Sequence, residues 1–465
     1  MPLRQRWIVG VSCFLWKTTG LTAFGHLPGD AVYINLGGVD YRCSAADNDV
    51  GTVVRTAQQR RVDMIDRDDV LRARETLQGV VHHTRLDYSQ TFSRISGNEV
   101  YLKTENTQRT GSFKIRGAYN LISSLGEKER SNGVVAASAG NHAQGVAYAA
   151  AEVGIPSTIV MPEGTPISKV SATRGYGAEV VLHGSGYDEA YLRAREIQRE
   201  SGATFVHAFD DPRIIAGQGT IGPEILEDLT QVDAVVVPIG GGGLISGIGL
   251  AIKETNPRVR IIGVEAAGAA SVTRSLETGE VVELDGAETI ADGISVKRPG
   301  EITFPLIQKY VDEVVTVSDE EIASSVLMGL ERAKMVTEGA GAASLAAVLF
   351  EKTGLKDRVV VSVLSGGNID VNLISRIIDQ GLMKSGRRVA LGTIIPDRPG
   401  NLQKFLRIVA DQGASVLTIS QDRLDVRVPL DKVEVQVVLE TQGSDHVGRI
   451  LDALRDADYG VTILS

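Results

Sequence analysis

Cysteine and tryptophan are almost missing from this chain of 465 residues, and the few that occur lie at one end. Both cysteines (Cys13, Cys43) and both tryptophans (Trp7, Trp16) precede residue 44. Catalysis by a thiol, disulfides and cysteine-ligated zinc are therefore excluded from the rest of the chain. The same bias sets residues 1–63 apart, and we interpret them as an N-terminal extension that is either non-native or disordered.

The chain also lacks an excess of basic residues and any long apolar run. It contains 48 Lys and Arg against 58 Asp and Glu, a net charge of -10, which does not favour a polyanionic partner such as nucleic acid. No window approaches the ~18 consecutive apolar residues of a membrane span. We expect a cytoplasmic protein that acts on a small molecule, with no nucleic-acid or membrane partner.

From residue 64 onward, the sequence alternates short apolar runs with helical patterns. Such a βα rhythm predicts a parallel sheet that is covered by helices on both faces. Ligands of such sheets bind beyond the carboxyl ends of the strands. Three apolar runs are followed there by small and polar residues: SAGNH after 133–137, GGGGL after 233–239 and SGGN after 358–364.

The glycine run is the first candidate binding element. Gly240, Gly241, Gly242 and Gly243, followed by Leu244, lie between a buried strand and a helical pattern. Successive glycine N–H groups at a helix start suit an anion such as phosphate. The run matches neither the P-loop pattern nor GxGxxG, which disfavours a nucleotide. A tight turn without a ligand is the alternative that the glycines alone leave open.

The second candidate is Lys114, in the stretch TGSFKIRGA. A single lysine is ordinarily a solvated surface charge. A lysine that is held away from water near a phosphate-binding loop is what Schiff-base chemistry with pyridoxal phosphate requires.

Taken together, SFKIRGA, SAGNHAQG, GGGGL and SGGN resemble, in order and spacing, the fold type II pyridoxal-phosphate enzymes, and among them the threonine dehydratase (threonine ammonia-lyase) family. The resemblance covers about 64–380. It implies an α/β fold with two parallel-sheet subdomains and pyridoxal 5'-phosphate as cofactor. The sequence departs from the family at Thr84-Arg85, where Thr-Pro is usual.

The resemblance also implies the roles of individual residues. Lys114 would hold the cofactor as a Schiff base and remove the α-proton of the substrate, with Phe113 packed near the ring. Asn141 would bond to the ring hydroxyl, and Ser365 would face the ring nitrogen. The phosphate would lie on the backbone of Gly240, Gly241, Gly242, Gly243 and Leu244.

The SAGNH segment would bind the substrate carboxylate through Ser138, Ala139, Asn141 and His142. His142 is a candidate general base, but we favour a structural hydrogen bond for it. Ala139 stands where similar racemases carry a second serine, so elimination without racemisation is expected. We expect no metal site.

The sequence pattern of residues 388–465 differs from the alternating βα pattern before it and predicts a βαββαβ, ferredoxin-like unit. The segment IPDRPGNL resembles the amino-acid-binding turn of an ACT domain. We therefore divide the chain into a catalytic domain (64–384) and a regulatory ACT domain (388–465), with a pure dimerisation module as the alternative. The candidate effector-binding residues, for a branched-chain amino acid such as isoleucine, are Asp397, Pro399, Gly400, Asn401 and Leu402.

The resemblance implies deamination of L-threonine to 2-oxobutanoate and ammonia by β-elimination of water, and of L-serine to pyruvate, in a homodimer or homotetramer. Two alternatives stay open: a serine racemase or serine dehydratase, which shares nearly every motif, and a non-catalytic amino-acid sensor.

Overall fold

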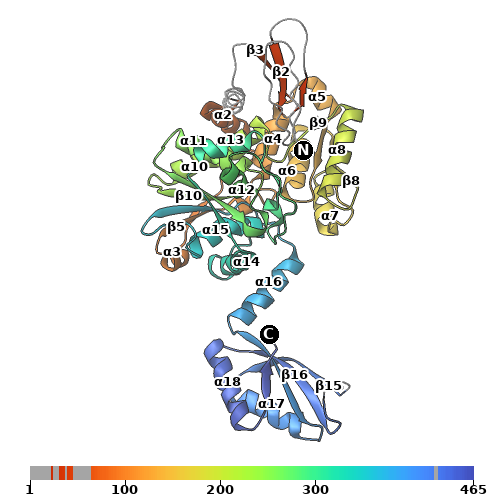
Figure 1. Cartoon of the computed structure of the whole chain (residues 1–465), viewed down its shortest axis with the longest axis vertical. Helices are drawn as coiled ribbons and strands as arrows, with labels where there is room; N and C mark the ends of the chain where they lie inside the picture. Colours follow the sequence, from red (N-terminus) through yellow and green to blue (C-terminus); the bar gives the residue numbers. More distant parts are fainter. Residues whose placement is uncertain (1–21, 25–30, 37–38, 45–63, 424–427, 465) are drawn as a thin grey trace, which may run out of the picture.

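The computed structural model describes residues 22–24, 31–36, 39–44, 64–423 and 428–464 (Figure 1). Three strands near the N-terminus form a small antiparallel sheet in the order β1-β2-β3: β1 (Thr22–Phe24), β2 (Ala31–Leu36) and β3 (Val39–Ser44). The other residues of the segment 1–63 lie outside the described residues. Our interpretation of that segment stays a prediction.

The larger sheet of the main body has six strands in the order β12-β11-β10-β13-β5-β4. All its pairings are parallel except β4 with β5. Every residue of β10 is buried, as expected for a central strand with helices on both faces. The strands are β4 (Leu86–Tyr88), β5 (Glu99–Lys103), β10 (Ala234–Pro238), β11 (Arg260–Ala266), β12 (Glu313–Val317) and β13 (Val359–Val363).

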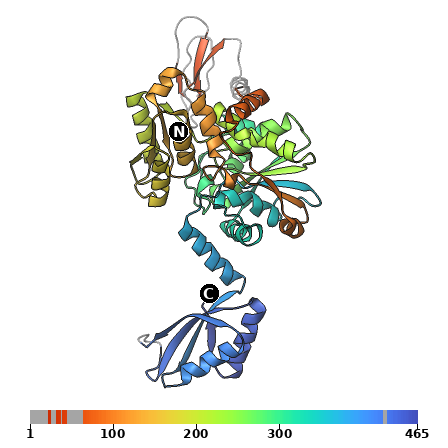
Figure 2. The ribbon, with the colours of Figure 1, turned by 180° about the vertical axis from the view of Figure 1, so that it is seen from behind.

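The smaller sheet is wholly parallel, in the order β8-β7-β6-β9. The chain starts in the larger sheet, crosses to the smaller one after β5 and returns at β10, so the two sheets form two α/β subdomains that stand side by side in Figures 1 and 2. The strands of the smaller sheet are β6 (Val134–Ala137), β7 (Ser157–Met161), β8 (Glu179–Leu182) and β9 (Thr204–Phe205).

Four helices begin at the candidate site: α4 (Lys114–Ser123), α6 (Asn141–Val153), α11 (Gly243–Lys253) and α15 (Gly339–Leu349). The others surround the sheets, and none of the described helices is long and apolar enough to cross a membrane. They are α2 (Arg67–Leu77), α3 (Gln90–Ser96), α5 (Glu127–Asn132), α7 (Ile167–Gly175), α8 (Tyr187–Ser201), α9 (Pro212–Gly219), α10 (Ile221–Asp228), α12 (Ser271–Thr278), α13 (Thr303–Tyr310) and α14 (Asp319–Met328), with short turns η1 (Glu105–Thr107), η2 (Ala267–Ala269), η3 (Asp292–Ile294) and η4 (Gly329–Ala333).

The C-terminal unit follows α16 (Val371–Lys384), which leads away from the main body in both views (Figures 1 and 2). It comprises β14 (Arg388–Pro396), α17 (Asn401–Asp411), β15 (Ser415–Asp422), β16 (Lys432–Glu440), α18 (Ser444–Asp456) and β17 (Val461–Ile463). The sheet is antiparallel, in the order β15-β16-β14-β17, and both helices pack on one face around Phe405 and Leu439. The βαββαβ prediction is confirmed.

The predicted α/β fold with two parallel-sheet subdomains is also confirmed. The three apolar runs named in the sequence are the strands β6, β10 and β13, while β4, β5, β9 and β12 went unpredicted. β5 illustrates why: its sequence EVYLK ends in Lys103, which is fully buried because it forms an ion pair of 2.7 Å with Glu224. A buried charge that is paired in the tertiary structure has no apolar signal in the sequence.

Candidate functional site

Lys114 is the first residue of α4, directly after Phe113 at the helix N-cap. Its Nζ donates a hydrogen bond to the backbone oxygen of Ala208 at 3.0 Å and lies 5.0 Å from the centre of the Phe113 ring. Burial lowers the pKa of Lys114 to about 8, and the negative charge of Glu338 opposes this shift only in part. A much larger share of its amino groups is neutral near pH 7 than for an exposed lysine, as a nucleophile or base needs.

The turn that carries Lys114 is attached to the end of β13. The N–H of Phe113 donates to the backbone oxygen of Ser365 at 3.1 Å, and Ser112 forms an isolated bridge with Gly366. Phe113 and Ser365, which are far apart in the sequence, therefore lie together. The Ser365 side chain is buried, with its Oγ 3.4 Å from the backbone oxygen of Ala340.

The glycine run forms the N-terminus of α11 and offers free backbone donors. Gly242 has φ of 95°, a conformation that favours glycine, and a Cβ added to Gly241 or Gly243 would collide with Phe209. The N–H groups of residues 241–244 have no acceptor within the part of the chain that the structure describes. Free N–H groups at a helix start fit the phosphate of the expected cofactor.

Asn141, the first residue of α6, is held between two other side chains. Asn368 Nδ2 donates to Asn141 Oδ1 at 2.8 Å and to the backbone oxygen of Thr110 at 2.7 Å. Asn141 Nδ2 donates in turn to Glu338 Oε1 at 2.6 Å. These contacts fix the orientation of the amide beside Lys114.

Glu338 was not identified from the sequence as a residue of the site. It is almost fully buried, and burial, with a smaller contribution from the charge of Asp292, raises its pKa to about 7. The available signal was a glutamate directly before the small-residue helix GAGAASLAAVL, at a position that favours the shorter Ser, Thr, Asp or Asn.

In the SAGNH segment, the side chain of Ser138 accepts the N–H of Gly140 at 3.2 Å, and Ala139 is partly buried. His142 is buried, and its Nε2 donates to the backbone oxygen of Val206 at 2.8 Å. Burial, supported by the charge of Lys114, lowers the pKa of His142 to about 3. A ring that is neutral and committed to a backbone contact agrees with the structural role that we favoured.

A second histidine near Lys114, His207, was not identified from the sequence. Its Nδ1 accepts the N–H of Asp210 at 2.9 Å and that of Phe209 at 3.3 Å, so the ring proton resides on Nε2. Burial lowers its pKa as well. His207 thus shapes the loop that carries Phe209 against the glycine run.

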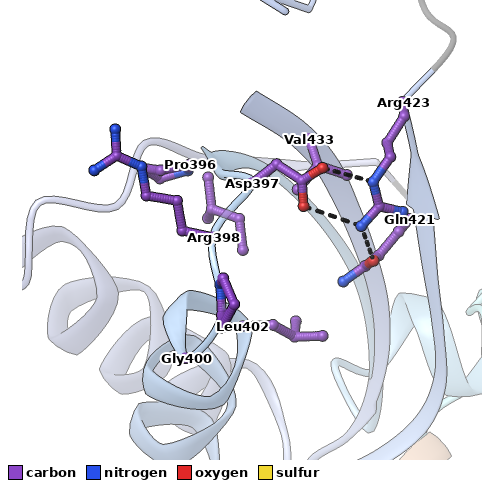
Figure 3. A pocket seen from close by; sticks show the side chains of 10 residues that line it. Pro396, Asp397, Arg398, Gly400, Leu402, Gln421, Arg423 and Val433 are labelled. Atoms are coloured by element: carbon purple, nitrogen blue, oxygen red, sulfur yellow. Dashed lines mark hydrogen bonds and ion pairs between the residues drawn. The ribbon is translucent and has the colours of Figure 1, made fainter. Parts of the chain in front are cut away.

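The C-terminal unit contains a cavity of about 310 Å³ at the turn between β14 and α17 (Figure 3). Asn401 does not line it and instead donates to the backbone oxygen of Pro396 at 3.2 Å. Its lining includes four of the five candidate effector residues and comprises Ile395, Pro396, Asp397, Arg398, Pro399, Gly400, Leu402, Gln421, Arg423 and Val433.

Asp397, one of the candidate effector-binding residues, already has a partner. Arg423 Nε and Nη2 donate to its two carboxylate oxygens at 2.7 and 3.0 Å, and Arg423 Nη2 also reaches Gln421 (Figure 3). Arg423 lies on the strand side of the cavity and was not predicted, because the sequence does not show which strand faces the turn.

Comparisons with known proteins identify the family. The model of the family described as pyridoxal-phosphate dependent enzyme matches residues 77–366. The L-threonine ammonia-lyase of Thermotoga maritima is 54% identical over 86% of this chain and 100% of its own length.

Two solved structures share the fold of the main body. Threonine deaminase isoform 2 of Solanum lycopersicum is 37% identical, with a TM-score of 0.64 over 70% of this chain and 88% of that one. Maize serine racemase is 35% identical, with a TM-score of 0.65 over 69% of this chain and 98% of that one. With the glycine cradle and the buried Lys114 in place, the chain belongs to the pyridoxal-phosphate dependent enzymes, in the family that includes the L-threonine ammonia-lyases.

Proposed function

We propose that the protein deaminates L-threonine to 2-oxobutanoate and ammonia by β-elimination of water, and L-serine to pyruvate by the same chemistry. The observation that carries the proposal is the buried Lys114, with its pKa lowered to about 8, beside the glycine cradle and Asn141. The 54% identity to the Thermotoga maritima L-threonine ammonia-lyase supports the choice of substrate.

Pyridoxal phosphate, when bound, withdraws electrons from the substrate Cα and so stabilises the negative charge that develops there. Lys114 would hold the cofactor, and its amino group, as a neutral amine, would take the proton from the substrate Cα. Its lowered pKa increases the share of the neutral form that this step needs. The N–H groups of residues 241–244 would hold the phosphate, and Asn141 would hold the ring hydroxyl.

The substrate carboxylate binds at the start of α6, where Ser138, Ala139 and Asn141 line the turn before the helix. His142 supports this turn through Val206. Ser365 would face the ring nitrogen, where its neutral hydroxyl would leave the nitrogen close to neutral and the ring a weaker electron sink than an aspartate would. A weaker sink favours prompt loss of the β-hydroxyl.

Serine racemisation is the second candidate, because maize serine racemase shares the fold. Ala139 argues against it, since a methyl group cannot deliver a proton to the opposite face of Cα. A non-catalytic sensor is disfavoured by the retention of Lys114, the glycine run and Ser365.

The test is to supply the purified protein with L-threonine and L-serine and to measure 2-oxo acids and D-serine. We expect 2-oxobutanoate and pyruvate, with little D-serine. Lys114→Ala should lose turnover and the visible absorbance of the lysine-bound cofactor while keeping its circular dichroism spectrum. D-serine formed as fast as pyruvate, or an active Lys114→Ala variant, contradicts the assignment.

For the C-terminal unit, we propose an ACT domain at residues 388–465 that regulates a catalytic domain at residues 64–384. The cavity at Asp397 and Gly400 supports this, because it combines a helix N-terminus with charged side chains of both signs, as recognition of a free amino acid needs. Isoleucine is the first candidate effector and valine the second. We place the enzyme in the cytoplasm as a homodimer or homotetramer.

A further inference from the structure

Glu338 occupies the N-cap position of α15, yet its side chain does not cap that helix. It turns instead towards Asn141 and accepts the Nδ2 proton at 2.6 Å, and it is only 4% exposed. Burying a carboxylate is costly unless it has a partner. The requirements of α15 do not explain this side chain, whereas the contact with Asn141 does.

The backbone around Glu338 leaves room for this contact. A Cβ on Gly366 would collide with Glu338 Oε1, and a Cβ on Gly293 would lie 3.3 Å from the same atom. Two segments that come from different parts of the sequence therefore lack side chains at the place where Glu338 meets Asn141. The meeting point is part of the active site, because Gly366 directly follows Ser365.

The contact determines which way the Asn141 amide faces. Asn368 donates to its oxygen, and Glu338 accepts one of its two N–H groups. The second N–H group remains for a ligand beside Lys114. Without Glu338, the nitrogen of this amide loses the acceptor that holds it in place.

Glu338 is also an acidic group whose charge acts on Lys114. The charged groups that face it are Lys114 from α4, Asp292 from η3 and Lys169 from α7. Asp292 raises its pKa, and the two lysines lower it; Asp292 and Lys169 are themselves paired at 2.8 Å. With burial as the largest cause, the pKa of Glu338 is about 7, so its charge changes close to neutral pH.

We propose that Glu338 is a positioning residue of the active site: it orients the Asn141 amide towards the ring hydroxyl of the cofactor and supplies a negative charge that stabilises positive charge on the Lys114 nitrogen. The proposal rests on the proposed attachment of the cofactor to Lys114. It assigns to Glu338 no contact with the reacting atoms.

The experiment compares Glu338→Gln and Glu338→Ala with the parent holoenzyme. Glutamine keeps an oxygen that can accept from Asn141 but carries no charge, whereas alanine removes both. The matched control is Glu105→Gln, which changes another fully buried carboxylate, paired with Arg116 instead of Asn141. The readouts are the affinity for pyridoxal phosphate, the pH titration of the absorbance of the lysine-bound cofactor, and thermal unfolding.

In Glu338→Gln, we expect a cofactor affinity within about threefold of the parent, because the amide stays oriented. Its absorbance midpoint should move to lower pH by about one unit, because the nearby negative charge is gone. Glu338→Ala should show the same pH shift and bind the cofactor about tenfold more weakly, as expected for the loss of a hydrogen bond to a charged group. Glu105→Gln should lose stability but keep the parent's midpoint.

A second measurement avoids substitution of a buried residue. Asp292 is 64% exposed in its side chain and raises the pKa of Glu338, so Asp292→Asn should fold normally and move any inflection near pH 7 towards lower pH. The shift should be about half a unit, because water screens an exposed charge.

An unchanged midpoint in Glu338→Gln, or an unmoved inflection in Asp292→Asn, overturns the role of the charge. Parent-like cofactor affinity in Glu338→Ala overturns the orienting role. Either result leaves the parent's turnover of L-threonine intact, whereas failure of the proposed function appears in the parent itself as missing 2-oxo acid.

Discussion

Two basic residues at the start of α4, two positions apart, serve different purposes. Lys114 is buried, and the charge of Glu338 offsets the effect of burial only in part, so its amino group loses its proton readily. Arg116 is buried between Glu105 and Glu224 and donates to both, so it remains charged and connects α4 to η1 and α10. Burial therefore makes the amino group of Lys114 more reactive. Arg116 is buried together with its carboxylate partners, so it stays charged and stabilises the packing of α4.

The low pKa of Lys114 predicts how the cofactor-free protein takes up pyridoxal phosphate. Only the neutral amine attacks the aldehyde, so the rate of reconstitution should rise about tenfold per pH unit below pH 8 and level off above it. Stopped-flow absorbance across pH 6 to 10 measures this. A rate that keeps rising beyond pH 9.5 indicates a lysine with an ordinary pKa and contradicts the prediction.

Arg116 and Arg74 form a matched pair, because both contact carboxylates of α10. Arg116→Met should cost about 3 to 5 kcal/mol, since it leaves the buried Glu105 without its ion-pair partner and Glu224 paired with Lys103. Arg74→Met removes an exposed pair with Glu227 and should cost less than about 1 kcal/mol. Urea unfolding measures both. Equal losses in the two variants mean that the network around Arg116 does not stabilise the fold as proposed.

At the scale of elements, the site consists of helix N-termini that converge from two subdomains. α6 follows β6 of the smaller sheet, and α11 follows β10 of the larger one. Parallel strands have their carboxyl ends at the same edge, so each contributes its following loop to a common region. We expect the glycine run to bind phosphate only while the Phe209 ring packs against its backbone, where a Cβ on Gly241 would collide with the ring.

Gly241→Ala tests that requirement. The added methyl group would collide with the Phe209 ring, which must move and displace the N–H groups from the phosphate. We expect at least about tenfold weaker binding of pyridoxal phosphate by equilibrium titration, as expected for the loss of charge-assisted hydrogen bonds.

Gly448→Ala in α18 is the control for this substitution, because a Cβ there meets nothing within 4 Å. It should leave cofactor binding unchanged and raise stability by up to about 1 kcal/mol, since alanine favours a helix interior. If Gly241→Ala binds the cofactor as tightly as the parent does, the assignment of the glycine run to the phosphate site is wrong.

At the scale of the whole molecule, the C-terminal unit connects to the main body through α16. Arg388 pairs with Asp379 of that helix, and Arg387 pairs with Glu331. The elements named for catalysis all lie before α16. The proposed regulation from the C-terminal cavity would therefore act through a change in assembly or in the position of this unit.

Cutting the chain after Gly386 tests this arrangement. We expect the shortened protein to keep L-threonine deamination and to lose its response to isoleucine and valine, which in the full chain should change activity by roughly 5- to 150-fold. Arg423→Ala in the full chain is the companion variant, because it removes the partner of Asp397 without removing the domain. If the shortened protein keeps the effector response, the regulatory role is wrong, and the C-terminal unit is better interpreted as an assembly module.

The sequence by itself determined the α/β and βαββαβ patterns, the cofactor family and the positions of Lys114 and the glycine run. These depend on local properties: apolar periodicity, the freedom of glycine and the order of short motifs. Only the tertiary structure decided that Glu338 contacts Asn141, 197 positions away in the chain, and that Arg423 forms an ion pair with Asp397. The physical reason is that buried charges are stabilised by partners from distant elements, and the sequence does not reveal those partners before the chain folds.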